Sequence, residues 1–255
     1  YGLFVNSGSS ACLLAIACLD LPKGCKIITP ACTFSTTLAP IIQLGFKPVF
    51  VDVDLSSMAI TSENIKKAIN ENTKAIVLVH VLGFNGLTDE IVKIAKENDL
   101  LLIEDCCESH GATFKGQHVG TIGDMSCFSF YFGHHMTTIE GGMISTDNEE
   151  IYELARMFRS HGMTREASVK THEKYSKKDV NPLFTFAVPG YNMRSSEINA
   201  VLGIEQLKRL DYNISIRQKN LHTWLSNLDP EIYFVDFDVE GSSNYALPLI
   251  LNKNY

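Results

Sequence analysis

The first 145 residues alternate between short apolar runs rich in strand-forming residues and stretches with helical periodicity. The strand-like runs are Lys26 to Thr29, Pro48 to Asp52, Ala75 to His80, Leu100 to Glu104, Ser126 to Phe130 and Met143 to Ser145. The helical stretches are residues 9–19, 34–44, 62–69 and 87–97. Repeated strand–helix–strand order predicts an α/β fold with a mostly parallel sheet and helices on both faces. Ligands of such sheets bind at the carboxyl ends of the strands, where functional side chains are expected.

The second half is mainly helical in pattern. Residues 149–160, 195–210 and 211–228 predict helices, the second with apolar residues at helical spacing: Ile198, Val201, Leu202, Ile204 and Leu207. Between the first two, Met163 to Pro189 is polar, rich in lysine and aperiodic, and it is longer than an ordinary connector, which favours a functional loop or lid. An apolar run at Ala246 to Leu251 predicts a further strand.

Composition and net charge limit the classes of partner that this chain can bind. With 255 residues, 45% of them hydrophobic and 20% charged, the chain has an ordinary globular composition. The net charge of -7 shows no excess of basic residues of the kind that binds nucleic acid. No apolar run reaches the roughly 18 residues that span a bilayer, so we expect no membrane partner and a cytoplasmic location.

The cysteines have no pattern typical of a zinc site. All seven lie in the first half, without paired C-x-x-C spacing: Cys12, Cys18, Cys25, Cys32, Cys106, Cys107 and Cys127. We expect them to be small buried hydrophobic residues in a reducing compartment, and we expect no metal.

Two segments contain groups suited to a phosphorylated ring. Gly8 and Ser9 precede a helical stretch and can present backbone N–H groups and a hydroxyl to a phosphate, although a plain helix cap has the same pattern. Asp105 ends a buried strand, where an unpaired carboxylate is costly, and a protonated ring nitrogen is a suitable partner for it. His80 ends another strand and fits either such a site or a structural role.

The stretch from Ser129 to Gly142, SFYFGHHMTTIEGG, resembles the cofactor-lysine loop of the DegT/DnrJ/EryC1/StrS sugar aminotransferases, with His134 at the lysine position. In that family the lysine binds pyridoxal phosphate covalently. No lysine occurs between Lys115 and Lys170, which argues against ordinary transamination. The resemblance implies the fold of the aspartate aminotransferase type, with a large domain at residues 1–237 and the start of a truncated small domain at 238–255. We therefore expect a fragment, shorter than the family at both ends.

The resemblance also implies roles for individual residues. Ser129 matches a phosphate-binding serine, and Asp105 matches the partner of the ring nitrogen. Phe34 matches the aromatic residue that stacks on the ring, although a core phenylalanine fits the sequence equally. Glu108 lies where many members have Gln or His near the ring oxygen. Asn192, in a Gly-Tyr-Asn-x-Arg segment, matches the residue that reaches the cofactor phosphate of the neighbouring subunit, which implies a homodimer with shared active sites.

Histidine in place of lysine is the pattern of the sugar 3-dehydratases of this superfamily. The resemblance implies that L-glutamate converts the cofactor to pyridoxamine phosphate, that His134 acts as the base, and that a 4-keto-6-deoxy sugar nucleotide loses its 3-hydroxyl. The implied substrate is GDP-4-keto-6-deoxymannose. The neighbouring His135 is the other candidate base, because adjacent residues of an extended loop point in different directions.

Three other functions stay open: a nucleotide-sugar aminotransferase, an enzyme like CDP-4-keto-6-deoxyglucose 3-dehydrase, and a non-catalytic scaffold that binds sugar nucleotides. The CDP-sugar enzyme carries an iron–sulfur cluster on cysteines that follow this loop. No cysteine lies between residues 128 and 255, which disfavours that route.

Overall fold

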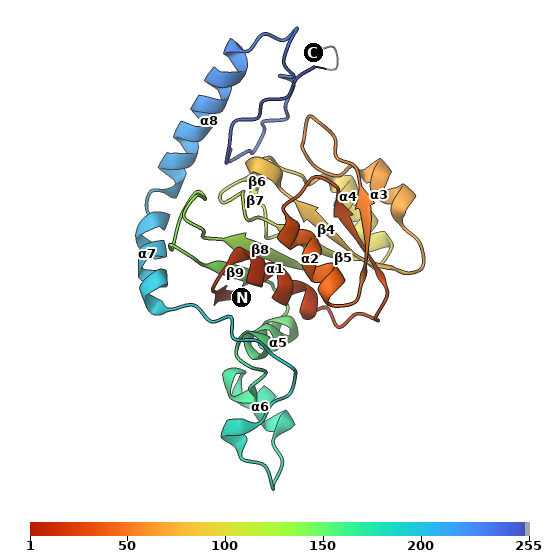
Figure 1. Cartoon of the computed structure of the whole chain (residues 1–255), viewed down its shortest axis with the longest axis vertical. Coiled ribbons are helices and arrows are strands. Elements are labelled where there is room, and N and C mark those ends of the chain that lie inside the picture. The colour runs from red at the N-terminus through yellow and green to blue at the C-terminus, as the bar shows by residue number, and fades with distance from the viewer. Residues whose placement is uncertain (253–255) are drawn as a thin grey trace.

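The computed structural model describes residues 1–252, which contain a seven-stranded sheet in the order β1-β9-β8-β5-β4-β2-β3 (Figure 1). Its strands are β1 (Gly2–Val5), β2 (Lys26–Pro30), β3 (Lys47–Val51), β4 (Thr73–Val79), β5 (Leu101–Asp105), β8 (Met125–Ser129) and β9 (Gly142–Ser145). Strand β9 runs antiparallel to both of its neighbours, and the pairs from β8 through β3 are parallel. The predicted α/β class and the six predicted strands of this sheet are confirmed, whereas β1 was not predicted.

Helices cover both faces of the sheet because successive residues of a buried strand point to opposite sides. Ile27 and Val77 pack in one core with α1 (Gly8–Ala17), α2 (Ser35–Gln43) and α5 (Glu149–Arg159). Ile28 and Ile76, one position away on the same strands, pack in the other core with α3 (Ser62–Ala68) and α4 (Asp89–Glu97). This alternation confirms the predicted placement of helices on both faces of the sheet.

Two helices, α7 (Glu197–Leu207) and α8 (Leu210–Asn227), run along one side of the molecule (Figure 1). Ser196 caps α7 by accepting a hydrogen bond from the backbone N–H of Asn199. Smaller elements are the hairpin β6 (Thr113–Phe114) with β7 (Gln117–His118) and the 3-10 turns η1 (Val81–Gly83), η2 (Thr164–Glu166) and η3 (Pro182–Phe184). No helix within residues 1–252 is both long enough and apolar enough to cross a bilayer.

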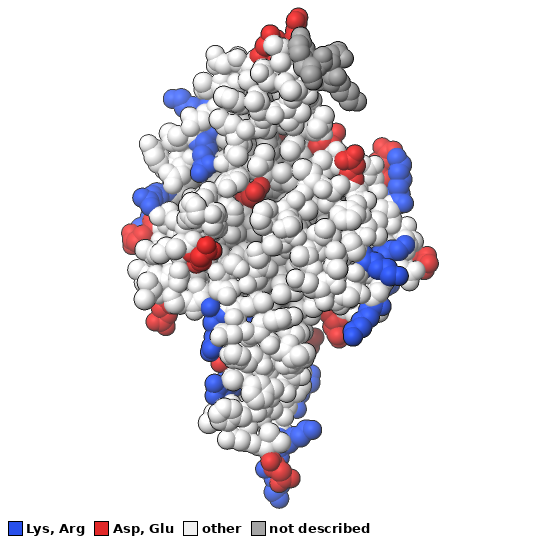
Figure 2. All heavy atoms as spheres, in the orientation of Figure 1, with Lys and Arg blue, Asp and Glu red and all other residues white. Residues whose placement is uncertain are grey.

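Residues 163–189 form a projection beyond α5 (Figure 1) that contains η2, the short helix α6 (Val169–Tyr175) and η3. Lysines at 170, 174, 177 and 178 are exposed on it, and Figure 2 shows basic side chains gathered along this projection. The segment is therefore partly helical, although its sequence is aperiodic.

The C-terminal segment packs back on the turn that follows β4. Ser243 donates its backbone N–H to Gly83 at 3.0 Å, and Tyr245 donates to Leu82 at 2.7 Å. The strand predicted at 246–251 is wrong: in the described part of the chain this run forms only an isolated bridge between Leu251 and Tyr233. Only the end of the run has a partner: Phe234 donates its N–H to Ile250 at 2.9 Å and Asn252 donates to Ile232 at 2.8 Å, and this pairing does not extend along the rest of the run. The predicted domain division at 237/238 stays a prediction, and its last residues, 253–255, lie outside the described part.

Candidate active site

A cavity of ≈ 670 Å³ opens at the carboxyl ends of β4, β5 and β8. Seven of the predicted site residues line it: Gly8, Ser9, Phe34, Asp105, Glu108, Ser129 and His134. Asn192 does not line this cavity. No residue of the projection at 163–189 lines it either, so the predicted lid does not cover the cavity within the described part of this chain.

The start of α1 forms one wall of the cavity. Ser7 caps the helix by accepting a hydrogen bond from the backbone N–H of Ser10 at 3.1 Å. The first N–H groups of a helix have no partner inside the helix, and they attract anions. Gly8 and Ser9 provide these groups beside the hydroxyl of Ser129. This wall has the donors that a phosphate requires.

Gly8 is in close contact with β8. A Cβ atom at this position would lie 2.5 Å from the Cβ of Ser129 and 2.9 Å from its Oγ. We expect Gly8→Ala to displace either the start of the helix or Ser129. Binding of pyridoxal phosphate should then weaken by about tenfold or more, and a tenfold loss of affinity corresponds to about 1.4 kcal/mol. Titration of the purified variant with the cofactor, followed by absorbance, measures this. Gly2→Ala is the matched control, because Gly2 does not line the cavity and a Cβ there would meet only the side chain of Met143, at 3.3 Å; equal weakening by both variants would contradict the expectation.

Asp105 lies at the floor of the cavity and is 6% exposed. Its Oδ2 accepts a hydrogen bond from Thr37 Oγ1 at 2.8 Å, and its Oδ1 accepts the backbone N–H of Cys107 at 3.1 Å. Within residues 1–252 it forms no salt bridge. Burial raises the pKa of this carboxyl to about 6, with a further contribution from Cys12 and an opposing one from Thr37. A buried carboxyl without a cationic partner fits a protonated ring nitrogen.

The two neighbouring histidines have different environments. His134 lines the cavity, and its Nδ1 lies 3.2 Å from the carbonyl oxygen of Ser129. Because a carbonyl can only accept, we assign the proton to Nδ1, which leaves Nε2 as the basic nitrogen. His135 is 4% exposed, and its Nε2 lies 3.1 Å from the carbonyl oxygen of Ser243. Burial lowers the pKa of His135 to about 4. This favours His134 over His135 as the base.

A backbone turn connects Glu108 with a residue that the sequence did not reveal. Leu82, with φ +53°, donates its N–H to Glu108 Oε2 at 2.9 Å and accepts the N–H of Tyr245. The ring centroid of Tyr245 lies 5.2 Å from that of His134 in an edge-on arrangement. Burial raises the pKa of Glu108 and of Tyr245. Glu108 thus lies in the cavity with a raised pKa, and its expected place near the ring oxygen of the cofactor stays a prediction.

The sequence allowed either a site role or a structural role for each of Phe34 and His80. Phe34 is 71% exposed at the cavity, so it is not a core residue. His80 is fully buried: its Nδ1 accepts the N–H of Gly86 at 3.1 Å, and its Nε2 lies 3.1 Å from Glu104 Oε2. Both ring nitrogens of His80 are therefore used, which confirms its structural role.

Asn192 lies outside the cavity of its own chain. It is exposed, forms an isolated bridge with Ser160, and accepts a hydrogen bond from Arg194 Nε at 3.2 Å. Its expected role toward a neighbouring subunit stays a prediction.

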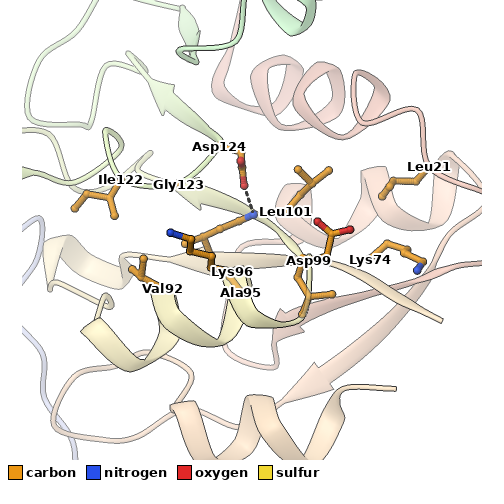
Figure 3. Close-up of a pocket in the computed structure, with 12 residues that line it drawn as sticks. Leu21, Lys74, Val92, Ala95, Lys96, Asp99, Leu101, Ile122, Gly123 and Asp124 are labelled. Carbon is orange, nitrogen blue, oxygen red and sulfur yellow. Dashed lines mark hydrogen bonds between the residues drawn. The ribbon is translucent and has the colours of Figure 1, made fainter. Parts of the chain in front are cut away.

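A second hollow of ≈ 610 Å³ lies at the opposite edge of the sheet (Figure 3). Lys74, Lys96, Asp99 and Asp124 line it near the amino ends of β4 and β5, and Asp124 accepts the N–H of Leu102 at 2.8 Å. No predicted site residue is among its lining residues, and parallel sheets bind ligands at the other edge.

The sheet order, the start of α1 at the cavity and the buried aspartate are those of a pyridoxal-phosphate enzyme fold of the aspartate aminotransferase type. The sequence model of the DegT/DnrJ/EryC1/StrS aminotransferase family matches residues 1–252, and the chain belongs to this family. It is 41% identical over 263 residues to GDP-4-keto-6-deoxy-D-mannose 3-dehydratase of Escherichia coli O55:H7, covering 100% of this chain and 68% of that protein.

Solved structures of such a dehydratase are similar in fold. A mutant GDP-4-keto-6-deoxymannose-3-dehydratase with bound GDP-perosamine superposes with a TM-score of 0.93 at 41% identity. The same enzyme with a trapped PLP-glutamate geminal diamine gives 0.93 at 40% identity. Each match covers 100% of this chain and 68% of the solved chain.

Proposed function

We propose that this chain is the cofactor-binding part of a pyridoxamine-phosphate-dependent nucleotide-sugar 3-dehydratase. Its substrate is a 4-keto-6-deoxy sugar nucleotide, GDP-4-keto-6-deoxymannose, and L-glutamate is the amino donor. The observation that supports this most strongly is His134 in the cavity at the position of the family's lysine, with Nε2 as its basic nitrogen. Similarity to solved dehydratases that contain GDP-perosamine or a PLP-glutamate adduct supports the choice of substrate and donor.

The residues that line the cavity fit the cofactor. Gly8, Ser9 and Ser129 would bind its phosphate, Asp105 its ring nitrogen, and Phe34 would cover the ring face. When bound, pyridoxamine phosphate supplies a primary amine for the sugar ketone and a ring that accepts electrons. Gly8 allows the start of α1 to lie close to Ser129, because a Cβ at this position would overlap that side chain.

His134 performs the proton transfer in this proposal. Its Nδ1 stays bonded to the carbonyl of Ser129, so the ring orientation is fixed and Nε2 can accept the proton that must leave before the sugar's 3-hydroxyl departs. The protonated imidazole can then donate to the departing hydroxyl, which leaves as water. No lysine is among the residues that line the cavity, so no side-chain amine is available there to bind the aldehyde form covalently.

The cofactor site is shared between two subunits in this proposal. One face of α7 exposes four large apolar residues with exposed fractions of 59% to 77%: Ile198, Val201, Ile204 and Leu207. Such a patch marks a contact surface. Asn192, which the family resemblance assigns to a neighbour's cofactor phosphate, is exposed shortly before this helix. A second copy of this chain would cover the face and bring Asn192 into its partner's cavity.

Charge on this face is expected to weaken the dimer. Burying one isoleucine is worth about 1.5–3 kcal/mol, so Ile198→Asp should raise the dimer dissociation constant more than about tenfold. Sedimentation velocity across a concentration series measures the change. Asn220→Asp, at an exposed polar position of α8, is the control. A dimer as tight in Ile198→Asp as in the control would show that α7 is not the interface.

The reaction is tested with the full-length protein, pyridoxal phosphate and L-glutamate, supplied in parallel with GDP-, CDP- and dTDP-linked 4-keto-6-deoxy sugars. Mass spectrometry of the products should show a 3-deoxy-4-keto sugar from the GDP-linked substrate. A 4-amino sugar would favour an aminotransferase instead. Conversion of only the CDP- or dTDP-linked sugar would show that the nucleotide is wrongly assigned.

A further inference from the structure

Three thiols surround the carboxyl of Asp105 at the floor of the cavity. Cys12 comes from α1, Cys107 follows β5, and Cys127 lies on β8. The Sγ of Cys12 lies 3.8 Å from Asp105 Oδ2, and the donor atoms of Cys12, Asp105 and Cys107 all lie within 4.8 Å of one another. Two thiolates and a carboxylate are ligands that Zn²⁺ and Cd²⁺ prefer.

We propose that Cys12, Asp105 and Cys107 bind a thiophilic divalent cation when the cofactor is absent, and that the cation competes with pyridoxal phosphate for Asp105. In a tetrahedral zinc site, bonds of about 2.3 Å to sulfur and about 2.0 Å to oxygen place neighbouring S and O ligands about 3.5 Å apart. The observed 3.8 Å between Cys12 and Asp105 is close to this spacing. Small side-chain movements therefore suffice to close the site.

Charge balance also favours capture of the cation. Binding releases one proton from each of the two thiols, so the gain of two positive charges is matched by two new thiolates. The buried cluster keeps the single negative charge that Asp105 already carries when ionised. Capture should accordingly strengthen as the pH rises.

The site has an entry path and supporting contacts. Asp105 and Cys107 line the cavity, so a cation can enter where the cofactor would bind. Thr37 Oγ1 and the backbone N–H of Cys107 orient the carboxylate. By contrast, the other close group consists of His80, Glu104 and Cys106, and none of these three residues lines the cavity.

The test is a Cd²⁺ titration of the full-length, cofactor-free protein, followed by thiolate-to-cadmium absorption in the ultraviolet. We expect saturable binding of one equivalent that Cys12→Ser and Cys107→Ser each weaken at least about tenfold. Cys32→Ser is the control, because Cys32 is an exposed thiol of the same cavity outside the cluster. If Cys12→Ser does not fold, the Cd²⁺ affinity of Cys107→Ser is the test, because Cys107 is less buried than Cys12. Absence of the band, or its loss only in Cys32→Ser, would overturn the site.

Competition is measured by adding pyridoxal phosphate before Cd²⁺, with cofactor binding followed by its own visible absorption. Saturating cofactor is expected to raise the apparent Cd²⁺ dissociation constant at least about tenfold, in line with mutual exclusion at one site. Unchanged Cd²⁺ affinity in protein that has bound the cofactor would overturn the competition. A protein that binds Cd²⁺ but no cofactor would contradict the proposed function and leave the metal site standing.

Discussion

Replacing His134 with asparagine is expected to lower the rate of 3-deoxy sugar formation by about 10²–10⁴-fold, the usual contribution of a positioned general base. The asparagine amide can keep the hydrogen bond to the carbonyl of Ser129 but cannot accept a proton near neutral pH. Binding of the cofactor should persist, because its phosphate and ring nitrogen have other partners. Steady-state kinetics combined with a cofactor titration separates the two effects.

His135→Asn is the matched control for this experiment. His135 is buried beside Ser243 and does not line the cavity, so its replacement should lower the thermal midpoint more than the chemical step. A rate lost in His135→Asn and retained in His134→Asn would reverse the assignment of the base.

Asp105→Asn is expected to abolish cofactor binding at micromolar concentrations and yet to stabilise the cofactor-free protein near pH 7. The pKa of Asp105 is raised to about 6 by burial, against about 3.9 in an unfolded chain. The unfolded state therefore loses this proton first, and the free energy of unfolding of the cofactor-free protein falls as the pH rises from about 4 to about 6. A shift of about two units corresponds to about 3 kcal/mol.

The asparagine variant has no proton to lose at this position, so its free energy of unfolding should lack that fall. Urea denaturation of both cofactor-free proteins at about pH 3.5 and about pH 7.5, below and above this range of pH, measures the difference. Saturating cofactor should restore stability to the wild-type protein only, because a protonated ring nitrogen pairs with the carboxylate. Equal pH dependence of the two cofactor-free proteins would show that Asp105 is ionised without penalty.

Local pattern in the sequence was enough to predict most of the sheet. The runs at β4 and β5 are apolar and bounded by helical stretches, so their type and order could be read directly. Strand β1 was missed because its four residues have little local signal, and it pairs with β9, more than a hundred residues away. The apolar run at 246–251 shows the opposite error, since a strand-like pattern does not ensure pairing along its whole length, and only its end pairs with residues 232–234.

The cavity residues that were predicted belong to short motifs, such as Gly8 and Ser9 before a helix or Asp105 at a strand end. Tyr245 and Leu82 come together only through tertiary contacts, and neither lies in a recognisable pattern. Thr37 could have been found, because it lies one helical turn after Phe34 and can face the same site. The choice between His134 and His135 needed the structure, since only side-chain direction separates them.

The central claim is that the cofactor's nitrogen leaves as ammonia and is not retained in the sugar. The most direct measurement is the ratio of ammonia, 2-oxoglutarate and consumed GDP-4-keto-6-deoxymannose in one reaction with L-glutamate and the full-length protein. Elimination through His134 predicts equal amounts of all three, with a 3-deoxy-4-keto product. Consumption of the sugar with formation of 2-oxoglutarate and an amino sugar, without ammonia, would contradict this account.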